Sequence, residues 1–256
     1  MKTFYFLQSI LILLLIYSLY GCKKDYSKEG GEPLSSINCI NCTYLPLCDS
    51  SQFVYIDSVA GVVDTTRNEM FILGDTLINS KKFYKVSPLA AFNQGLFYNC
   101  DNQEYKLLIS LSAFGVNIDS LKNVMLGMIQ LPFPVPPEFI NIPDKQLITV
   151  LKANAAVSAK WTDTIASAGI PFVYFAFVGM EHQLLEKNVQ RTVLQKTYSN
   201  VMHVQSKPVA SIPGADFPVE YQVDIYFAKD VGIIEMEVRN AQGVQSNSKL
   251  LDYKIK

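Results

Sequence analysis

The chain has few of the residues that most often carry out chemistry or bind nucleic acid. Only 18% of its 256 residues are charged, and 22 lysines and arginines are nearly balanced by 23 aspartates and glutamates. This balance, without a basic cluster, argues against a nucleic-acid partner. The sequence contains two histidines and one tryptophan, and it lacks the motifs H-E-x-x-H, G-x-S-x-G and G-x-G-x-x-G. We therefore assign no catalytic residues from motifs, and we predict neither a cofactor nor a metal site.

Long apolar runs are also scarce. One run extends from Phe4 to Tyr20, directly after Lys2. A positive start, an apolar segment and small residues before a boundary are typical of an export signal. The run also approaches the length of a membrane span, so a transmembrane anchor and an ordinary secretory signal are the alternatives.

The boundary of this run carries the most informative residue. The segment Leu19-Tyr20-Gly21-Cys22 resembles the lipobox of bacterial lipoproteins. The resemblance implies that Cys22 becomes the first residue of the mature protein and attaches it to a membrane through acyl chains. The following Lys23-Lys24-Asp25 loosely resembles a surface-export signal. We thus expect a lipid-anchored protein of the cell envelope, in the outer membrane. Whether it lies on the periplasmic face or on the surface face of that membrane is not assigned.

Three parts of the chain follow from these observations. Residues 1–21 are the predicted signal peptide. Residues 22–38, with the acylated Cys22, are polar and contain Gly and Ser without periodicity, which is typical of a flexible tether. Residues 39–256 are expected to form a single β-rich domain.

Four cysteines remain beyond Cys22. They are Cys39, Cys42, Cys48 and Cys100. An even number outside the cytoplasm is typical of two disulfides, and the sequence does not choose among the three pairings. A bond from the 39–48 cluster to Cys100 would hold the N-terminal segment against the first strands. A metal site and a redox pair at Cys39 and Cys42 are weaker alternatives, because Cys100 stands alone and no βαβ pattern surrounds Cys39.

The hydrophobic pattern after the tether predicts a mainly β protein. Short runs rich in aromatic and β-branched residues are separated by turn residues, which favours an antiparallel sheet. The expected strands of the first half are 53–56, 70–73, 82–86, 95–98 and 105–111, with a turn at Gly74-Asp75. The fold class is therefore a curved antiparallel sheet or half-barrel.

One central helix interrupts the predicted strands. Apolar residues recur at helical spacing between Ile118 and Ile129, and Asn117 or Asp119 is placed to cap the segment. The proline-rich residues 131–137 are incompatible with a helix or a central strand, and we expect an extended connection there.

The second half has the clearest alternation. Polar and apolar residues alternate in 220–227 and again in 231–239, with a turn near 228–230, so we expect a hairpin with one wet face carrying Glu235 and Glu237. Further strands are expected at 198–204 and 249–255. Residues 172–178 are apolar throughout, which predicts a strand buried on both faces. Its aromatic residues are our candidate ligand-binding residues: Phe172, Tyr174, Phe175 and Phe177.

Short segments of the chain resemble lipoproteins of the Bacteroidota. These are 196–201 and 226–235 near the C-terminus, 74–79 with 82–85 near the start of the sheet, and Lys160-Trp161-Thr162-Asp163 before the second half. Such proteins have sheets similar to the half-barrel of the lipoprotein-localisation carriers, which hold acyl chains. The resemblance implies a fold more strongly than a function.

The functional hypotheses rest on the apolar surplus and on the two histidines. Extra Phe, Tyr and Met are explained by the filling of a core, but in a curved sheet they can also enclose an apolar cavity. The first hypothesis is therefore binding or carriage of an apolar or glycan ligand, or a role in an envelope assembly, without enzymatic activity. The alternatives are an extracytoplasmic hydrolase that uses His203 or His182 with a carboxylate, and a purely structural lipoprotein. Glu181 and His182 are adjacent in a predicted strand, so they should point to opposite faces. The membrane is the one partner we predict, and no protein partner is assigned.

Acylation of Cys22 can be tested directly. We expect the Cys22→Ala chain to lose the acyl chains, because the thiol that carries them is removed, and to lose the membrane attachment that they provide. Mass spectrometry of the N-terminal peptide and membrane fractionation measure both effects. Cys39→Ala is the matched control and should remain acylated, whereas acyl chains on the Cys22→Ala protein would contradict the assignment.

Overall fold

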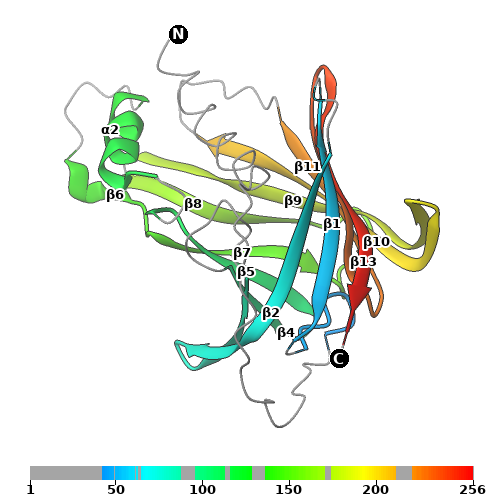
Figure 1. The fold of residues 1–256 in the computed structure, drawn as a ribbon. Helices are drawn as coiled ribbons and strands as arrows, with labels where there is room; N and C mark the ends of the chain where they lie inside the picture. Colours follow the sequence, from blue (N-terminus) through cyan, green and yellow to red (C-terminus); the bar gives the residue numbers. More distant parts are fainter. Residues whose placement is uncertain are drawn as a thin grey trace.

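The described part of the protein is a curved sheet with one α-helix and one short 3-10 helix. The computed structural model describes residues 42–48, 50–60, 62, 65–87, 96–112, 116–128, 136–170, 174–211 and 221–255. Thirteen strands in these residues form one sheet in which all neighbouring strands are antiparallel. Figure 1 shows the curvature of this sheet, with α2 near β6 and β8. The mainly β fold with one central helix, expected from the sequence, is confirmed.

The elements are strands β1 to β13, one α-helix and one short 3-10 helix. Their bounds are β1 Gln52–Val59, β2 Thr66–Ile78, β3 Lys81–Val86, β4 Phe97–Asp101, β5 Glu104–Ser110, α2 Ile118–Met128, η2 Pro137–Phe139, β6 Ile140–Asn141, β7 Lys145–Lys152, β8 Lys160–Ile170, β9 Tyr174–Val193, β10 Lys196–Ser211, β11 Gln222–Ala228, β12 Gly232–Asn240 and β13 Gly243–Lys254. The order across the sheet is β6-β8-β9-β10-β11-β12-β13-β1-β2-β3-β4-β5-β7.

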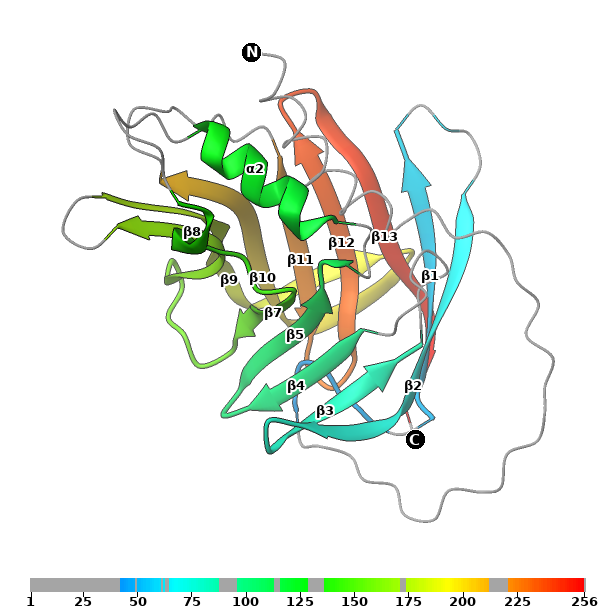
Figure 2. The same ribbon diagram turned by 90° about the vertical axis from the view of Figure 1, so that its left-hand side faces the viewer.

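The sheet curves until its two ends face each other. Figure 2 shows β5 and β7 lying opposite β8 and β9, with α2 across one end of the curved sheet. The side chains on the inner face form the main core, which includes Tyr84, Tyr105, Leu184, Phe227 and Leu250, each no more than 1% exposed. We call this surface the inner face, and the opposite surface of the same strands the outer face.

A short segment before β1 closes the end of the inner face that lies away from α2 (Figure 2). Leu45 and Leu47 are buried in the main core, and the backbone N–H of Tyr44 donates to the Tyr105 hydroxyl at 2.9 Å. A disulfide joins Cys42 to Cys100 in β4, with their Cα atoms 6.1 Å apart. The segment is therefore held to the sheet both by apolar burial and by a covalent bond.

Helix α2 packs on the inner face at the other end of the sheet. Its N-terminus is capped by Asn117, whose side-chain oxygen accepts from the backbone N–H of Ser120 at 2.9 Å. Met125, which is 1% exposed, belongs to a second core with Ala176 and Val178 of β9. The helix therefore covers the ends of β8 and β9 and leaves the main core to the strands.

The two sheet ends are joined by side chains. Strands β7 and β8 are not neighbours in the hydrogen-bonded order. The Trp161 indole N–H donates to the carbonyl oxygen of Thr149 at 2.7 Å, and the backbone N–H of Thr149 donates to Asp163 at 2.6 Å. The amide of Gln146 donates to the carbonyl oxygen of Ile165 at 3.1 Å. We call this junction of Gln146, Thr149, Trp161 and Asp163 the seam.

Gly179 permits the strand pairing behind the seam. A Cβ atom at this position would lie 2.4 Å from the backbone oxygen of Asp163. Any other residue would therefore push β9 away from β8 where Asp163 turns toward Thr149. The register of the two strands shifts nearby, between Thr164 and Ala166.

The predicted strands are mostly in place, with one wrong turn. Gly74-Asp75 is not a turn, because β2 continues to Ile78 and its register with β3 shifts between Ile72 and Asp75. Gly74 has a φ of 109°, so this glycine makes a bulge within the strand. The actual turn follows at Asn79 and Ser80, both with positive φ, as a two-residue hairpin turn requires.

Strands β7 and β8 were not predicted from the sequence as strands. They are the two strands that form the seam, and their residues include Gln146, Thr149, Thr162 and Asp163. Polar residues of this kind weaken the apolar pattern of a strand. Most of the proline-rich segment 131–137 lies outside the described residues.

The seam can be tested with its tryptophan. We expect Trp161→Phe to lower the free energy of unfolding by about 2–3 kcal/mol, because it leaves the Thr149 carbonyl without its donor and reduces a buried ring. Urea unfolding followed by circular dichroism measures this change. Lys160→Gln is the control on the same strand, since it removes only an exposed ion pair with Glu181 and should cost less than about 1 kcal/mol. Equal stability of Trp161→Phe and the native chain would show that the seam does not hold the fold.

Candidate functional site

The inner face changes from apolar to polar along four adjacent strands. One row of directly paired residues crosses the sheet from β9 to β1: Leu184, Val204, Ile225, Met236, Ser248 and Asp57. The next row toward the helix end consists of Trp161, His182, Ser206, Val223, Val238, Ser246 and Val59. From β11 to β13 both rows change from apolar to polar side chains, and the first row continues this change to Asp57 on β1.

The polar group at β1 and β13 is buried. Asp57 is 5% exposed and Ser246 is 3% exposed. The Asn68 amide of β2 donates to one oxygen of Asp57, and Ser248 hydrogen-bonds to the same carboxylate. Burial raises the pKa of Asp57, although these two hydrogen bonds oppose the shift. We call Asp57, Asn68, Ser246 and Ser248 the inner polar patch.

A second polar group on the inner face lies beside the seam. The Nδ1 atom of His182 lies 2.7 Å from the Ser206 hydroxyl, and its Nε2 atom lies 3.2 Å from Asp163. The ring of Trp161 stacks on that of His182 with their centroids 5.6 Å apart. Glu181 points to the other face, where it pairs with Lys160 and Lys207, as strand alternation predicts.

The contacts of His182 resemble a Ser–His–Asp arrangement but lack its function-defining geometry. In a catalytic triad the carboxylate accepts a hydrogen bond from the imidazole and thereby orients it. Here Nε2 makes no hydrogen bond, and the carboxylate of Asp163 instead accepts from the backbone and side chain of Thr149. His182 and Ser206 are both buried, and the imidazole is not oriented by the carboxylate as a triad requires. The group is better explained as a polar connection among β8, β9 and β10.

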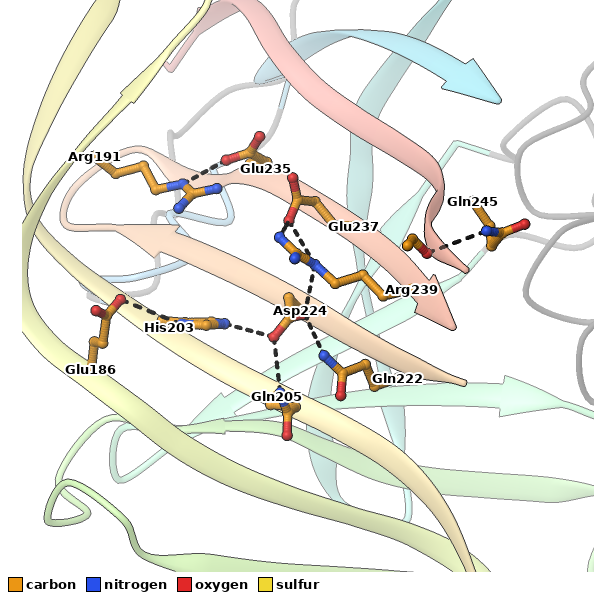
Figure 3. A network of polar contacts seen from close by, with 11 residues as sticks. Glu186, Arg191, His203, Gln205, Gln222, Asp224, Glu235, Glu237, Arg239 and Gln245 are labelled. Atoms are coloured by element: carbon orange, nitrogen blue, oxygen red, sulfur yellow. Dashed lines mark hydrogen bonds and ion pairs between the residues drawn. The ribbon is translucent and has the colours of Figure 1, made fainter. Parts of the chain in front are cut away.

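The outer face of β9 to β13 carries a connected network of charged side chains, shown in Figure 3. Asp224 lies at its centre and accepts from His203 at 2.7 Å and from the amides of Gln205 and Gln222 at 3.3 and 3.2 Å. Arg239 reaches both Asp224, at 3.3 Å, and Glu237. Although burial opposes it, hydrogen bonds from His203 and Gln205 hold the pKa of Asp224 below its usual value.

An aromatic ring organises the other half of this network. The guanidinium of Arg191 lies 3.6 Å from the centroid of the Tyr226 ring and donates to Glu235 at 2.6 Å. The ring of His203 stacks on the same tyrosine with a centroid distance of 4.3 Å. Burial raises the pKa of Tyr226 to about 12, so its hydroxyl stays protonated at neutral pH.

The expectation that Glu235 and Glu237 lie on a wet face was wrong. Glu235 is 3% exposed and Glu237 is 8% exposed, although both point away from the main core. The long side chains of Arg191 and Arg239 lie against them and satisfy their charges. Alternation located the correct face, but the sequence pattern could not show that neighbouring strands would supply arginines to cover it.

The second histidine belongs to this network. His203 contacts Asp224 on one side and lies 3.4 Å from Glu186 on the other. The imidazole therefore lies between two carboxylates, one on β9 and one on β11. All its contacts are with groups that the fold already uses for packing and charge balance, which indicates a structural role.

The predicted site residues fall in different places. Cys42 and Cys100 form a disulfide, and Cys48 is also disulfide-bonded. Cys22, Cys39 and Phe172 lie outside the described residues, as do the side chains of Tyr174 and Phe175. Phe177 is half-buried and alternates with Ala176 and Val178, which pack with α2. It is therefore on the outer face and does not line the inner one.

The described part of the chain contains neither a cluster of metal ligands nor a membrane-spanning helix. No group of three or more His, Cys, Asp or Glu residues is arranged to hold a metal ion there. No helix within those residues has the length and hydrophobicity to cross a membrane. The inner polar patch was not foreseen, because its four residues come from three strands and form no sequence motif.

Comparison with known proteins gives only a distant structural likeness. No protein-family model matches the chain, and no curated protein matches it. A crystal structure from Parabacteroides distasonis named as a lipoprotein is similar with a TM-score of 0.45 and 11% identity, over 84% of this chain and 100% of that one. An exported protein of Bacteroides fragilis named for its YmcC-like fold is similar with a TM-score of 0.45 and 10% identity, over 83% and 99%. At these values the likeness establishes neither family nor function.

The outer network should make stability depend on pH. We expect Asp224→Asn to lower the free energy of unfolding at neutral pH by about 1–2 kcal/mol, because charge-assisted hydrogen bonds are lost. Since the folded-state pKa of Asp224 is lowered, its contribution is present above the pKa of the unfolded chain and disappears as pH falls through the folded value. The difference between native and variant chains should therefore shrink in acid.

Urea unfolding at several pH values between neutral and strongly acidic measures this dependence. Asp101→Asn, at an exposed carboxylate, is the control and should leave the curve unchanged at every pH. A loss for Asp224→Asn that is the same at every pH would contradict the electrostatic explanation.

Proposed function

We propose that this chain is a lipid-anchored protein of the cell envelope that binds a small, largely apolar ligand on the inner face of its sheet. The proposed location in the cell envelope rests on Cys22, which follows an apolar segment in a lipobox-like context. The disulfide between Cys42 and Cys100 supports it, because such bonds persist in oxidising compartments outside the cytoplasm.

One observation carries the binding function. The inner face places a few buried polar groups, Asp57 and Ser246 among them, beside a larger apolar surface that includes Ile225 and Val238. This combination is typical of small-molecule sites, in which apolar contacts give affinity and a few polar groups give orientation. A core that served packing alone would be more stable with apolar residues at the polar positions.

The outer face is less suited to binding a ligand. Its carboxylates at Asp224, Glu235 and Glu237 are each engaged by arginine, histidine or glutamine side chains. A ligand at this surface would have to displace bonds that already exist. The inner face is therefore the better candidate for binding.

Native mass spectrometry tests the proposal. The Cys22→Ala chain, exported and purified from a bacterial envelope without detergent, is expected to carry a non-covalent species of lipid-like mass. The same sample measured after denaturation is the control, and there the added mass should disappear. A chain that shows the bare polypeptide mass in both spectra would contradict tight binding of an apolar ligand.

The enzymatic alternative has one specific observation in its favour, the contact of His182 with both Ser206 and Asp163. Hydrolysis of a series of acyl esters by the native chain and by Ser206→Ala decides it. Because Nε2 of His182 makes no hydrogen bond to the carboxylate that would orient it, we expect no difference between the two chains. Hydrolysis that is lost in Ser206→Ala would establish the enzyme and overturn the non-enzymatic function.

A further inference from the structure

The inner polar patch contains two buried atoms without a partner. Within the described residues, Oδ1 of Asp57 and Oγ of Ser246 have no hydrogen-bond partner. Both side chains share the inner face, since Asp57 pairs with Ser248 and Ser246 is two residues before it on β13. Strands β1 and β13 thus place a hydrogen-bond acceptor, Oδ1 of Asp57, and a hydroxyl, Oγ of Ser246, on the same face of the sheet.

These two atoms cost stability unless something binds to them. A buried polar atom without a hydrogen bond typically costs about 1–3 kcal/mol. Asn68 donates to the other oxygen of Asp57, Oδ2, and not to Oδ1. Burial also raises the pKa of Asp57, which means that its ionised form is disfavoured in the folded chain.

The apolar surroundings of the patch are equally well defined. In the two rows that contain Asp57 and Ser246, the next residues across the sheet are Met236 and Ile225 in one row, and Val238 and Val223 in the other. Val223 and Val238 are buried, at 4% and 3% exposure. A molecule seated on these rows would meet an apolar surface on β11 and β12 and a polar one on β13 and β1.

We propose that the ligand is an amphiphile whose head group is a hydrogen-bond donor, an alcohol or a primary amine, and that this head group binds between Asp57 and Ser246. The apolar part of the molecule lies along Ile225, Met236 and Val238. This assignment rests on the proposed function and specifies the chemical class of its ligand.

The chemistry of the patch selects the donor. An ionised carboxylate only accepts hydrogen bonds, so Oδ1 of Asp57 requires an N–H or O–H. A ligand carboxylate would instead place a second negative charge beside Asp57 in a poorly solvated site. The cations on the adjacent strands do not relieve this, because Arg239 and Lys249 contact Glu237 and Glu235 on the outer face.

The test compares three probes with the same alkyl chain: dodecylamine, dodecanol and dodecanoate. Their binding to the detergent-free Cys22→Ala chain is measured by isothermal titration calorimetry at neutral pH. We expect the amine and the alcohol to bind at least about tenfold more tightly than the carboxylate, a ratio equivalent to about 1.4 kcal/mol. Asp57→Asn should reduce the ratio of amine to carboxylate affinity about tenfold, and Ser246→Ala should weaken the amine and the alcohol.

Stability separates a binding role from a structural one. Because Asp57 is disfavoured in its ionised form, Asp57→Asn is expected to raise the thermal midpoint at neutral pH by about 2–4 °C while impairing binding. Ser246→Ala should leave the midpoint unchanged or raise it, since it removes a hydroxyl without a partner. The matched control Ser58→Ala removes an outer-face hydroxyl that donates to Asn247 at 2.9 Å, so it should lower the midpoint and leave binding unchanged.

The outcomes distinguish this inference from the function on which it rests. If no probe binds the native chain, the binding function itself is wrong. If all three probes bind equally, or if the preference survives in both Asp57→Asn and Ser246→Ala, the inner face binds apolar molecules but the head group does not lie at this patch. A preference for the donors that is lost in these variants and kept in Ser58→Ala supports the proposal.

Discussion

The curved shape of the protein depends on the seam, where side chains join two strands that share no backbone ladder. An edge strand exposes backbone donors and acceptors that must be covered or hydrated. Trp161, Asp163 and Gln146 supply these partners across the gap between β7 and β8. The two halves of the sheet therefore face each other and share one core, although no backbone hydrogen-bond ladder joins β7 to β8. Gly179 is part of the same constraint, because only a glycine lets β9 approach the backbone at Asp163.

Bringing the ends of the sheet together gives its two faces different chemistry. On the outer face, carboxylates and cations from four strands neutralise one another. The Tyr226 ring contacts both the guanidinium of Arg191 and the ring of His203, and these contacts hold it in place. On the inner face, Asp57 has one oxygen that no side chain among the described residues satisfies. Both groups are buried polar clusters, but only one of them is complete. This difference, and not the presence of charged residues as such, is why we propose a ligand site on the inner face and a structural role for the outer network.

Several parts of the fold followed from local patterns. The helix begins with an Asn117 cap and ends within one residue of its expected boundary, because its apolar spacing and its capping residue are both local signals. The hairpin of β11 and β12 is equally clear, since strict alternation specifies both the strands and their faces. Gly74 shows where local rules mislead: glycine marks a turn or a bulge, and only the partner strand decides between them.

The sequence by itself determined the β class, the central helix, the histidines as strand residues and the expected attachment through Cys22. Each of these depends on spacing or on a short segment. Only the tertiary structure decided which cysteine pairs with Cys100, that Glu235 and Glu237 are buried, and that Asp57 lies opposite Ser248 and on the same face as Ser246. These relations join residues far apart in the chain. They depend on strand order and register, which follow from the packing of the whole sheet and leave no local signal in the sequence.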